Sequence, residues 1–337
     1  MKQDVFAREP LISVVINTYN KGATLEKVLA ALACKENIDR NAFEVVVRDD
    51  GSSDDTWQRL EALVPRWNGH LRSSRGANAG VSQARNIAVR EARGEFVVII
   101  ADDIVASPTF LMEHLKRQAH ETSHGACAVI GKVLWPPELA RDPFRHWLDN
   151  GGPQFAYWRI KSSTVGPRFF YACNISARRE ILLAHPFDPD IRYGYEDTEL
   201  GIRLRDSGVR LLYHPEAWGY HHHPRSFEEF RTRQYRVGRS LYAALRNHPG
   251  MAEEIPPPKF ALRKQVRLAL RWMIYPVAEL AAEQVPLARH VQQRYWRTSL
   301  HRALVRGFHD AQREDGCPPP HLQGTMSSQS PWGPPAR

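Results

Sequence analysis

An apolar run that ends in two aspartates constrains this fold more than any other stretch of the chain. Phe96 to Ile100 are five consecutive apolar residues. They lack the period of an amphipathic helix, which predicts a strand buried on both faces of a sheet. Asp102 and Asp103 follow directly. Ligands of open α/β sheets bind at the carboxyl ends of strands, where adjacent carboxylates suit a hard divalent cation. Alone, the pair is equally typical of a polar turn.

The chain before this run alternates strand and helix patterns. Apolar runs predict strands at 11–16, 43–47 and, more weakly, 70–73, and helical spacing follows each of them. This alternation is typical of a parallel sheet with helical crossovers. We therefore expect an α/β fold with a mainly parallel central sheet flanked by helices. Polar residues follow each strand, so they gather at one edge of the sheet.

The second half of the chain continues with less regular elements. We expect a helix at 108–118, a strand at 126–133, a helix beginning at Glu196, and two short strands at 209–214 and 217–220. The chain contains neither Gly-x-Gly-x-x-Gly nor Gly-x-x-x-x-Gly-Lys-Ser/Thr. If phosphates bind at the sheet edge, metal and basic side chains must hold them. The net charge of +9 suits an anionic partner.

Four segments together resemble family 2 glycosyltransferases of the GT-A fold, of the non-processive kind. Their sequences, in the family's order, are Val14-Val15-Ile16-Asn17-Thr18-Tyr19-Asn20, Arg48-Asp49-Asp50-Gly51-Ser52-Ser53-Asp54-Asp55-Thr56, Gly80-Val81-Ser82-Gln83-Ala84-Arg85-Asn86, and Gly94-Glu95 to Asp103. The likeness covers about residues 10 to 225. Each segment alone is a weak signal, whereas the ordered set is highly specific.

The resemblance implies a nucleotide-sugar donor site, most often for a UDP-sugar. Asp50 would accept a hydrogen bond from the base, and Thr18, Tyr19 and Asn20 would line its pocket. Arg85 would contact the base or a phosphate. From the residues alone, Asp50 could equally cap a helix, and Arg85 could lie on a solvated helix face.

The resemblance also implies a metal. Asp102 would lie near the ribose, and Asp103 would ligate Mn²⁺ or Mg²⁺ on the diphosphate. Many GT-A enzymes take a further ligand from a histidine after the last strand, where this chain has three in a row. His221 is the first choice and His223, on the same side of the strand, is the second. His222 is expected to point away.

The catalytic residues implied by the resemblance begin a helix. Asp197 would be the general base that removes the proton of the acceptor hydroxyl, and Glu196 would orient the acceptor or the base. A carboxylate suits this role because it stays ionised at neutral pH. The reaction would then invert the anomeric carbon by direct displacement. The alternative for two acids at a helix start is complementation of the helix dipole.

The carboxyl-terminal part is basic. Ser226 and Glu229 fit a capping box that opens a helix. Its arginines either form a solvated face or contact a diphosphate or an anionic acceptor; they are Arg231, Arg233, Arg236 and Arg239. The basic helical region at about 260–310 could lie on an anionic membrane surface. Packing against the catalytic domain or a second subunit explains it equally well.

These patterns predict a GT-A domain at 1–250, with a nucleotide-binding half at about 10–105 and an acceptor half at about 106–225. A basic helical appendage at 251–315 and a disordered tail at 316–337 would follow. The start of the chain is charged, so we expect no signal peptide. Scattered cysteines favour the cytoplasm, with peripheral contact at the inner membrane face as an option.

The sequence therefore predicts a metal-dependent inverting glycosyltransferase. It would transfer one sugar from a nucleotide-sugar donor to a hydroxyl of a glycan or lipid-linked acceptor in polysaccharide biosynthesis. No nucleic-acid partner is expected, because no recognition motif accompanies the basic charge. The alternative is a catalytically inactive nucleotide-binding scaffold. The sugar, the acceptor and the oligomeric state are left open.

Overall fold

The computed structural model describes residues 9–34, 38–191, 193–258 and 286–316. The chain forms two compact units. The first comprises Met1–Leu139, Arg159–Arg192 and Glu196–His223, and the second comprises Ala140–Trp158, Tyr193–Tyr195 and Pro224–Arg337.

The first unit is built on one eight-stranded sheet with the order β3-β2-β1-β4-β7-β6-β8-β5. The strands are β1 (Ile12–Thr18), β2 (Phe43–Asp49), β3 (Leu71–Arg75), β4 (Phe96–Ile100), β5 (Ile104–Ala106), β6 (Cys127–Leu134), β7 (Asn174–Arg178) and β8 (Arg210–His221). The sheet is mixed: four neighbouring pairs are parallel and three are antiparallel. The parallel part, β3-β2-β1-β4, lies within the segment for which the sequence predicts a nucleotide-binding half, and β7 begins the antiparallel part.

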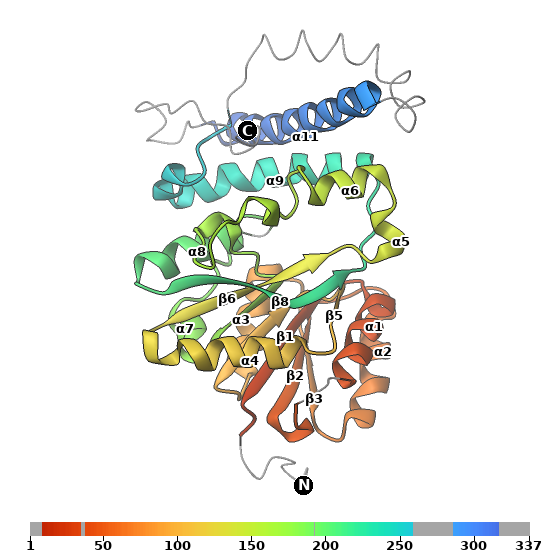
Figure 1. Ribbon diagram of the computed structural model, residues 1–337, viewed down its shortest axis with the longest axis vertical. Coiled ribbons are helices and arrows are strands. Elements are labelled where there is room, and N and C mark those ends of the chain that lie inside the picture. Colours follow the sequence, from red (N-terminus) through yellow and green to blue (C-terminus); the bar gives the residue numbers. More distant parts are fainter. Residues whose placement is uncertain (1–8, 35–37, 192, 259–285, 317–337) are drawn as a thin grey trace. The chain divides into compact units, whose positions relative to one another are not determined.

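Helices cover both faces of this sheet (Figure 1). They are α1 (Gly22–Ala33), α2 (Thr56–Leu63), α3 (Val81–Glu91), α4 (Phe110–Glu121), α5 (Pro137–Ala140), α7 (Arg179–Ala184) and α8 (Glu196–Asp206). Short 3₁₀ turns are η1 (Arg40–Ala42), η2 (Val64–Trp67), η3 (Thr122–His124), η4 (Tyr157–Arg159) and η5 (Pro167–Phe169). On one face, α3, α7 and α8 enclose a core with alternate strand residues such as Val15, Val97 and Ile175. This alternation keeps β4 buried on both faces, as its sequence predicts.

The last strand differs from the prediction. The sequence suggests two short strands around Pro215, whereas β8 is one strand of 12 residues. Its pairing with β6 shifts register between Ile130 and Lys132. Gly131 lies at that shift, where a Cβ would come within 2.1 Å of the Ala217 carbonyl oxygen. The bulge therefore accommodates the proline, which cannot donate to the ladder.

The second unit is helical. It contains α6 (Pro143–Asp149), α9 (Phe227–Asn247), η6 (Pro249–Glu253) and α11 (Pro286–Asp315) (Figure 1). The predicted capping box is confirmed: Ser226 and Glu229 bond reciprocally at the start of α9. Aromatic rings of three helices meet in its core, where Phe144 lies 5.2 Å from Trp296 and 5.9 Å from Phe230 between ring centroids. The second unit thus has an apolar core of its own.

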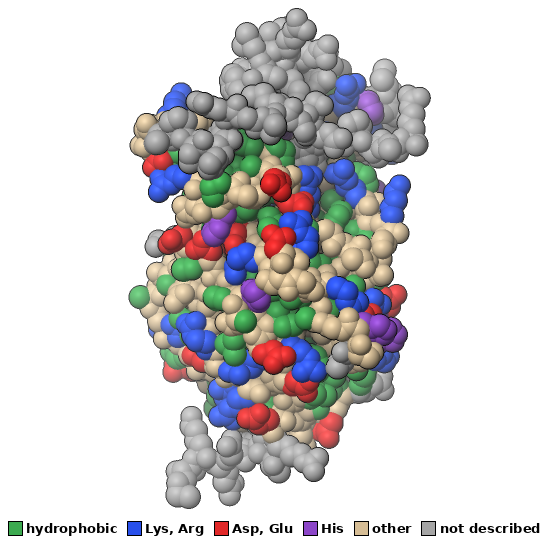
Figure 2. Space-filling view, turned by 90° about the vertical axis from the view of Figure 1, so that its left-hand side faces the viewer, with side chains coloured by type: hydrophobic (Ala, Val, Ile, Leu, Met, Phe, Trp, Pro, Cys, Tyr) green, Lys and Arg blue, Asp and Glu red, His purple; other side chains and the backbone are tan. Residues whose placement is uncertain are grey.

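Among the described residues, no helix has both the length and the apolar character needed to cross a bilayer. On the face shown in Figure 2, basic and acidic side chains alternate between apolar ones. The proposed membrane-contact segment 260–310 is described only from residue 286 onward. The tail from residue 317 onward, expected to be disordered, also lies outside the described residues.

Candidate active site

The carboxyl ends of β1 and β4 bring the first two predicted residues together. Thr18 is the last residue of β1 and is fully buried. Its hydroxyl donates a hydrogen bond of 2.7 Å to Oδ2 of Asp102. The two residues are 84 positions apart in the chain, so the parallel pairing of β1 with β4 creates this contact.

Asp103 lies among cationic and imidazole groups. Its Oδ1 is 3.5 Å from Nε2 of His221, and its Oδ2 is 3.1 Å from Nδ1 of His223. The antiparallel pairing of β5 with β8 sets His221 opposite Ile104, next to Asp103. His222 donates its backbone N–H to the Asp103 carbonyl oxygen at 2.7 Å. The structure therefore brings both candidate histidines to Asp103.

A lysine completes this cluster. Nζ of Lys21 is 3.4 Å from Oδ2 of Asp103 and also contacts Nδ1 of His223. The sequence analysis did not single out Lys21, which precedes α1 and has no local pattern to distinguish it. The His221 ring also stacks on Trp135, with centroids 5.0 Å apart. Stacking fixes the plane of the imidazole beside the carboxylate.

The two adjacent aspartates differ in their electrostatic surroundings. Burial raises the pKa of Asp102 to about 7, and the negative charge of Asp103 adds to the rise. Burial would also raise the pKa of Asp103, but interactions with His221, His223 and Lys21 hold it well below its ordinary value. The pair therefore carries one firmly ionised carboxylate, directed at the cluster of nitrogen atoms.

The other aspartate pair is engaged by the protein itself. Oδ1 and Oδ2 of Asp50 accept the backbone N–H groups of Ala79 and Gly80, each at 2.9 Å. Asp49 accepts hydrogen bonds from the backbone and hydroxyl of Ser52. Asp50 thus ties the loop before α3 to the end of β2, which positions that loop beside the predicted donor pocket.

Asn20 performs a similar bridging role. It has a left-handed backbone with φ of 54°. Its Oδ1 accepts the backbone N–H groups of Ser53 at 2.8 Å and Asp54 at 3.3 Å. Neighbouring Tyr19 is 46% exposed. Tyr19 is therefore available for stacking on a base, while Asn20 holds the loop after β1 to the loop after β2.

Arg85 joins the two halves of the first unit. It lies on α3, and its Nη1 donates to Oε1 of Glu196 at 2.9 Å. Its Nε donates to Oδ1 of Asn17 at 3.2 Å. Both charged side chains are more than nine-tenths buried. The other carboxylate oxygen of Glu196, Oε2, is buried and makes no hydrogen bond to the described residues, so it is available to a substrate hydroxyl.

Asp197 begins α8 beside Glu196, and its Oδ1 accepts the Thr198 N–H at 2.8 Å. Burial raises the pKa of the Cys173 thiol, and the negative charges of Asp197 and Asp103 raise it further. The backbone of Cys173 bonds to Ala101, next to Asp102. The Cys173 backbone therefore joins the residue before β7 to the turn that carries Asp102 and Asp103.

The family comparison covers the donor side of this site, including Thr18, Asp50 and Asp103, and ends before Glu196. Residues 13–182, about half of the chain, match the family model described as Glycosyl transferase family 2. The chain belongs to glycosyl transferase family 2. The family and the glycosyltransferase class predicted from the four segments are therefore confirmed.

Individual relatives resemble this family 2 member at moderate identity. Validoxylamine A glucosyltransferase of Streptomyces hygroscopicus subsp. jinggangensis is 29% identical over 234 residues, which are 62% of this chain and 55% of that protein. This chain thus spans about half the length of the validoxylamine A glucosyltransferases it matches.

Solved structures share the fold. A mannosyltransferase of Pyrobaculum calidifontis, in complex with GDP-Man and Mn²⁺, superimposes with a TM-score of 0.59 at 20% identity, covering 91% of this chain and 88% of that one. TarS of Staphylococcus aureus in complex with UDP gives 0.50 at 18% identity, with 90% and 91% covered. The predicted GT-A fold of this family 2 member is confirmed.

The chemistry of the Asp103 cluster fits a divalent cation. A carboxylate and two imidazoles are donor groups that bind Mn²⁺ and other divalent ions. The Lys21 ammonium lies against Asp103 and His223, so the cluster already accommodates one positive charge. The family 2 member therefore has a donor set in which a metal would take the place of the lysine.

Proposed function

We propose that this protein is an inverting glycosyltransferase that transfers one sugar from a nucleotide-diphosphate sugar to an acceptor hydroxyl. The observation that carries the proposal is the Asp103 cluster, in which a carboxylate at the sheet edge meets two imidazoles and an ammonium group. Relatives with GDP-Man, UDP and Mn²⁺ in their structures support a nucleotide-sugar donor and a divalent cation. We take the donor to be a UDP-sugar, and the acceptor to be a hydroxyl of a glycan or lipid-linked glycan.

The donor half, at about 10–105, would hold the nucleotide. Tyr19 would stack on the base, and Asp50 would face it from the end of β2. Thr18 keeps Asp102 oriented through its 2.7 Å hydrogen bond. Asp103, His221 and His223 would hold Mn²⁺ or Mg²⁺. When bound, that ion neutralises the charge that develops on the departing diphosphate.

The acceptor half, at about 106–225, would supply the base. Asp197 removes the proton from the acceptor hydroxyl as its oxygen attacks the anomeric carbon. The Thr198 N–H donates to Oδ1 of Asp197 at 2.8 Å, which orients the carboxylate at the start of α8. Glu196, fixed by Arg85, accepts a second hydroxyl through its unpaired Oε2. Direct displacement with one base inverts the anomeric configuration.

Asp197→Asn tests this assignment. It should lower kcat by about 100-fold to 10,000-fold, the range for loss of a positioned general base. UDP affinity in the presence of Mn²⁺, measured by calorimetry, should change less than twofold because Asn preserves the shape. A panel of UDP-sugars and GDP-mannose, assayed for hydrolysis and transfer, identifies the donor. An inactive scaffold would bind UDP and turn over none of them.

A further inference from the structure

A polar groove lies between α9 and α11 in the second unit. Its cavity volume is about 510 Å³, within the usual range for small-molecule sites. Residues on one face of α11 form one wall, at spacings of three, four and seven positions. The lining residues are Arg231, Thr232, Tyr235, Ser299, Arg302, Ala303 and Arg306.

Close contact of the two helix backbones positions this groove. A Cβ on Gly238 would lie 2.0 Å from the Leu304 carbonyl oxygen, and a Cβ on Gly307 would lie 1.9 Å from that of Tyr235. Only glycine permits this approach. The helices are therefore held together beside the groove, and its walls are rigid elements rather than loops.

The three arginines of the groove differ in their ion pairs. Arg231 pairs with Glu228 at 2.6 Å, and Nε of Arg306 is 3.5 Å from Asp310. Asp310 also accepts the Tyr235 hydroxyl at 3.0 Å and contacts Arg313. Arg302 makes no ion pair with any described residue. The groove therefore contains one guanidinium, that of Arg302, which pairs with no described carboxylate, between two arginines that each have a carboxylate partner.

A buried hydroxyl supplies a second, independent indication of a ligand. Ser299 is only 6% exposed, and its Oγ makes no hydrogen bond to the described residues. The preceding Thr298 shows the usual alternative, since its hydroxyl bonds to the Arg294 carbonyl oxygen at 2.7 Å. An unsatisfied buried hydroxyl costs free energy, so a ligand that accepts from Ser299 would recover it.

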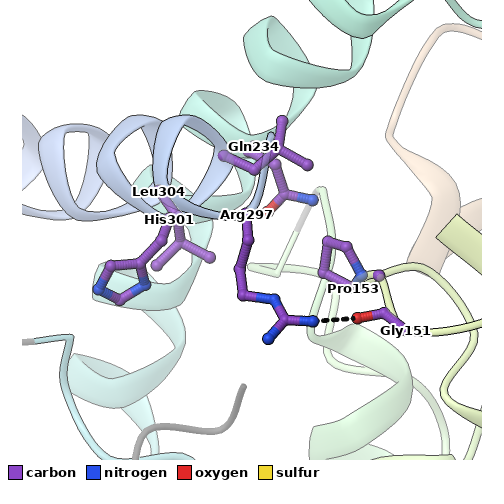
Figure 3. A pocket seen from close by; sticks show the side chains of 8 residues that line it. Gly151, Pro153, Gln234, Arg297, His301 and Leu304 are labelled. Carbon is purple, nitrogen blue, oxygen red and sulfur yellow. Dashed lines mark hydrogen bonds between the residues drawn. The ribbon is translucent and has the colours of Figure 1, made fainter. Parts of the chain in front are cut away.

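A second cavity between the same helices provides a contrast (Figure 3). It holds only about 20 Å³, enough for a water molecule. Its arginine, Arg297, is already used, because it donates to the Gly151 carbonyl oxygen at 3.1 Å. The small cavity is a packing gap between the helices. The larger groove has room for a ligand and contains Arg302, which pairs with no described carboxylate.

We propose that the groove binds the phosphate group of a phosphate ester. Arg302 provides a planar pair of donors that matches two phosphate oxygens. Ser299 donates to the same group from the floor, and Arg231 and Arg306 neutralise its charge from either side. The volume exceeds that of phosphate, so the attached glycerol or sugar fits with it. The site uses none of the Asp103 cluster and stands independently of the proposed donor site.

The test measures binding of glycerol 3-phosphate to the full chain, by ³¹P NMR titration in EDTA. Arg302→Gln should weaken binding about tenfold, since a charge-assisted hydrogen bond is lost. Ser299→Ala should weaken it several-fold without lowering Tm, because the hydroxyl makes no hydrogen bond to any described residue. Arg294→Gln is the matched control. It removes the same charge from an exposed position of α11 and should bind as the wild type does.

A parallel arm identifies the source of the phosphate. Sedimentation with phosphatidylglycerol vesicles, compared with phosphatidylcholine vesicles, tests a lipid headgroup. Binding to phosphatidylglycerol alone that Arg302→Gln abolishes would assign the groove to a lipid, and glycerol 3-phosphate binding would assign it to a soluble ester. Binding in neither arm overturns the proposal, as does an equal loss in Arg294→Gln and Arg302→Gln.

Discussion

Two Asp-Asp pairs lie at the carboxyl ends of β2 and β4, on either side of β1, and their surroundings differ. In the Asp49-Asp50 pair, backbone N–H groups fill both oxygens of Asp50, and Ser52 occupies Asp49. In the Asp102-Asp103 pair, Asp103 faces the side chains of Lys21, His221 and His223. Asp50 thus fixes a loop through backbone hydrogen bonds, whereas Asp103 binds side chains that can rotate away from it.

The nature of the donors explains the difference. Backbone N–H groups cannot leave Asp50 without unfolding the loop before α3, whereas the Lys21 ammonium can rotate away from Asp103. Asp49 also has a cationic partner, since Nε of Arg75 lies 3.0 Å from its Oδ2. Only the cation beside Asp103 is accompanied by two imidazoles that could bind a metal. The first pair should therefore respond to substitution mainly through stability, and the second mainly through metal binding and activity.

Asp103→Asn should produce the largest effect. Loss of the ionised ligand should reduce Mn²⁺-dependent transfer about a thousandfold, because metal stabilisation of a leaving group is worth several kcal/mol. Initial rates over a Mn²⁺ titration measure the effect. Tm should fall only modestly, because the variant loses the charge interactions of Asp103 but keeps its backbone hydrogen bond to His222. A large fall in Tm with unchanged Mn²⁺ affinity would contradict this assignment, because it would show that Asp103 stabilises the fold and does not bind the metal.

A buried histidine outside both aspartate pairs should make the stability of the fold depend on pH. His114 on α4 lies fully buried between Ser176 and Asn174, 2.9 Å from each. Burial lowers its pKa to about 4. The unfolded chain, with an ordinary pKa near 6.5, takes up the proton first. Stability should therefore fall as the pH drops from about 6.5 to about 4, by up to about 3 kcal/mol.

Urea unfolding at several pH values checks this source. His114→Gln should flatten the dependence in that window, because the variant has no titrating group at this position. Its stability at pH 7.5 will be lower through altered packing, so the slope is the diagnostic quantity. If the unfolding free energy of the variant depends on pH as steeply as that of the wild type, groups other than His114, such as the two aspartate pairs, cause the loss of stability in acid.

Asp50→Asn should mainly destabilise the fold. One oxygen becomes an amide that cannot accept from the Ala79 or Gly80 N–H, which leaves a donor unpaired at a cost of about 1–3 kcal/mol. Urea unfolding measures this loss. Mn²⁺ affinity, measured by calorimetry, should stay within twofold of the wild type. Weakened metal binding with intact stability would show that Asp50 belongs to the cation site.

Lys21→Met should give the smallest change, and it should strengthen Mn²⁺ binding rather than weaken it. The lysine competes with a metal for Asp103, and a partly exposed ion pair is worth at most about 1 kcal/mol. Mn²⁺ should therefore bind up to about fivefold more tightly, as free Mn²⁺ measured by EPR would show. Lys27→Met, an exposed charge on α1, should leave affinity unchanged. Weaker Mn²⁺ binding in Lys21→Met would argue that the lysine supports the metal.

Local patterns were sufficient for much of the fold. The apolar run Phe96–Ile100 predicts β4, and the capping box at Ser226 predicts the start of α9, because both signals lie within a few neighbouring residues. Pro215 misled the sequence prediction for β8, because the register shift that accommodates it is seen only in the pairing with β6, where Ile130 faces Tyr213 and Lys132 faces Trp218. β5 was missed because its three residues are too few to show a period.

Some residues of the candidate site could be predicted from the sequence, and others only from the structure. Its carboxylates could be named from short segments that resemble the family. Their partners could not, since Lys21 meets Asp103 across 82 positions and Arg85 meets Glu196 across 111. The same holds for Ser299, whose unpaired hydroxyl is visible only once α9 and α11 are packed.

The sequence by itself determined the family, the alternation of strands and helices up to β4 and the acidic residues at the sheet edge, since each depends on nearby residues or their order. Tertiary structure decided which Asp-Asp pair is tied to backbone and which faces lysine and histidine. That choice depends on what strand pairing brings within hydrogen-bond distance, and no local pattern carries this information.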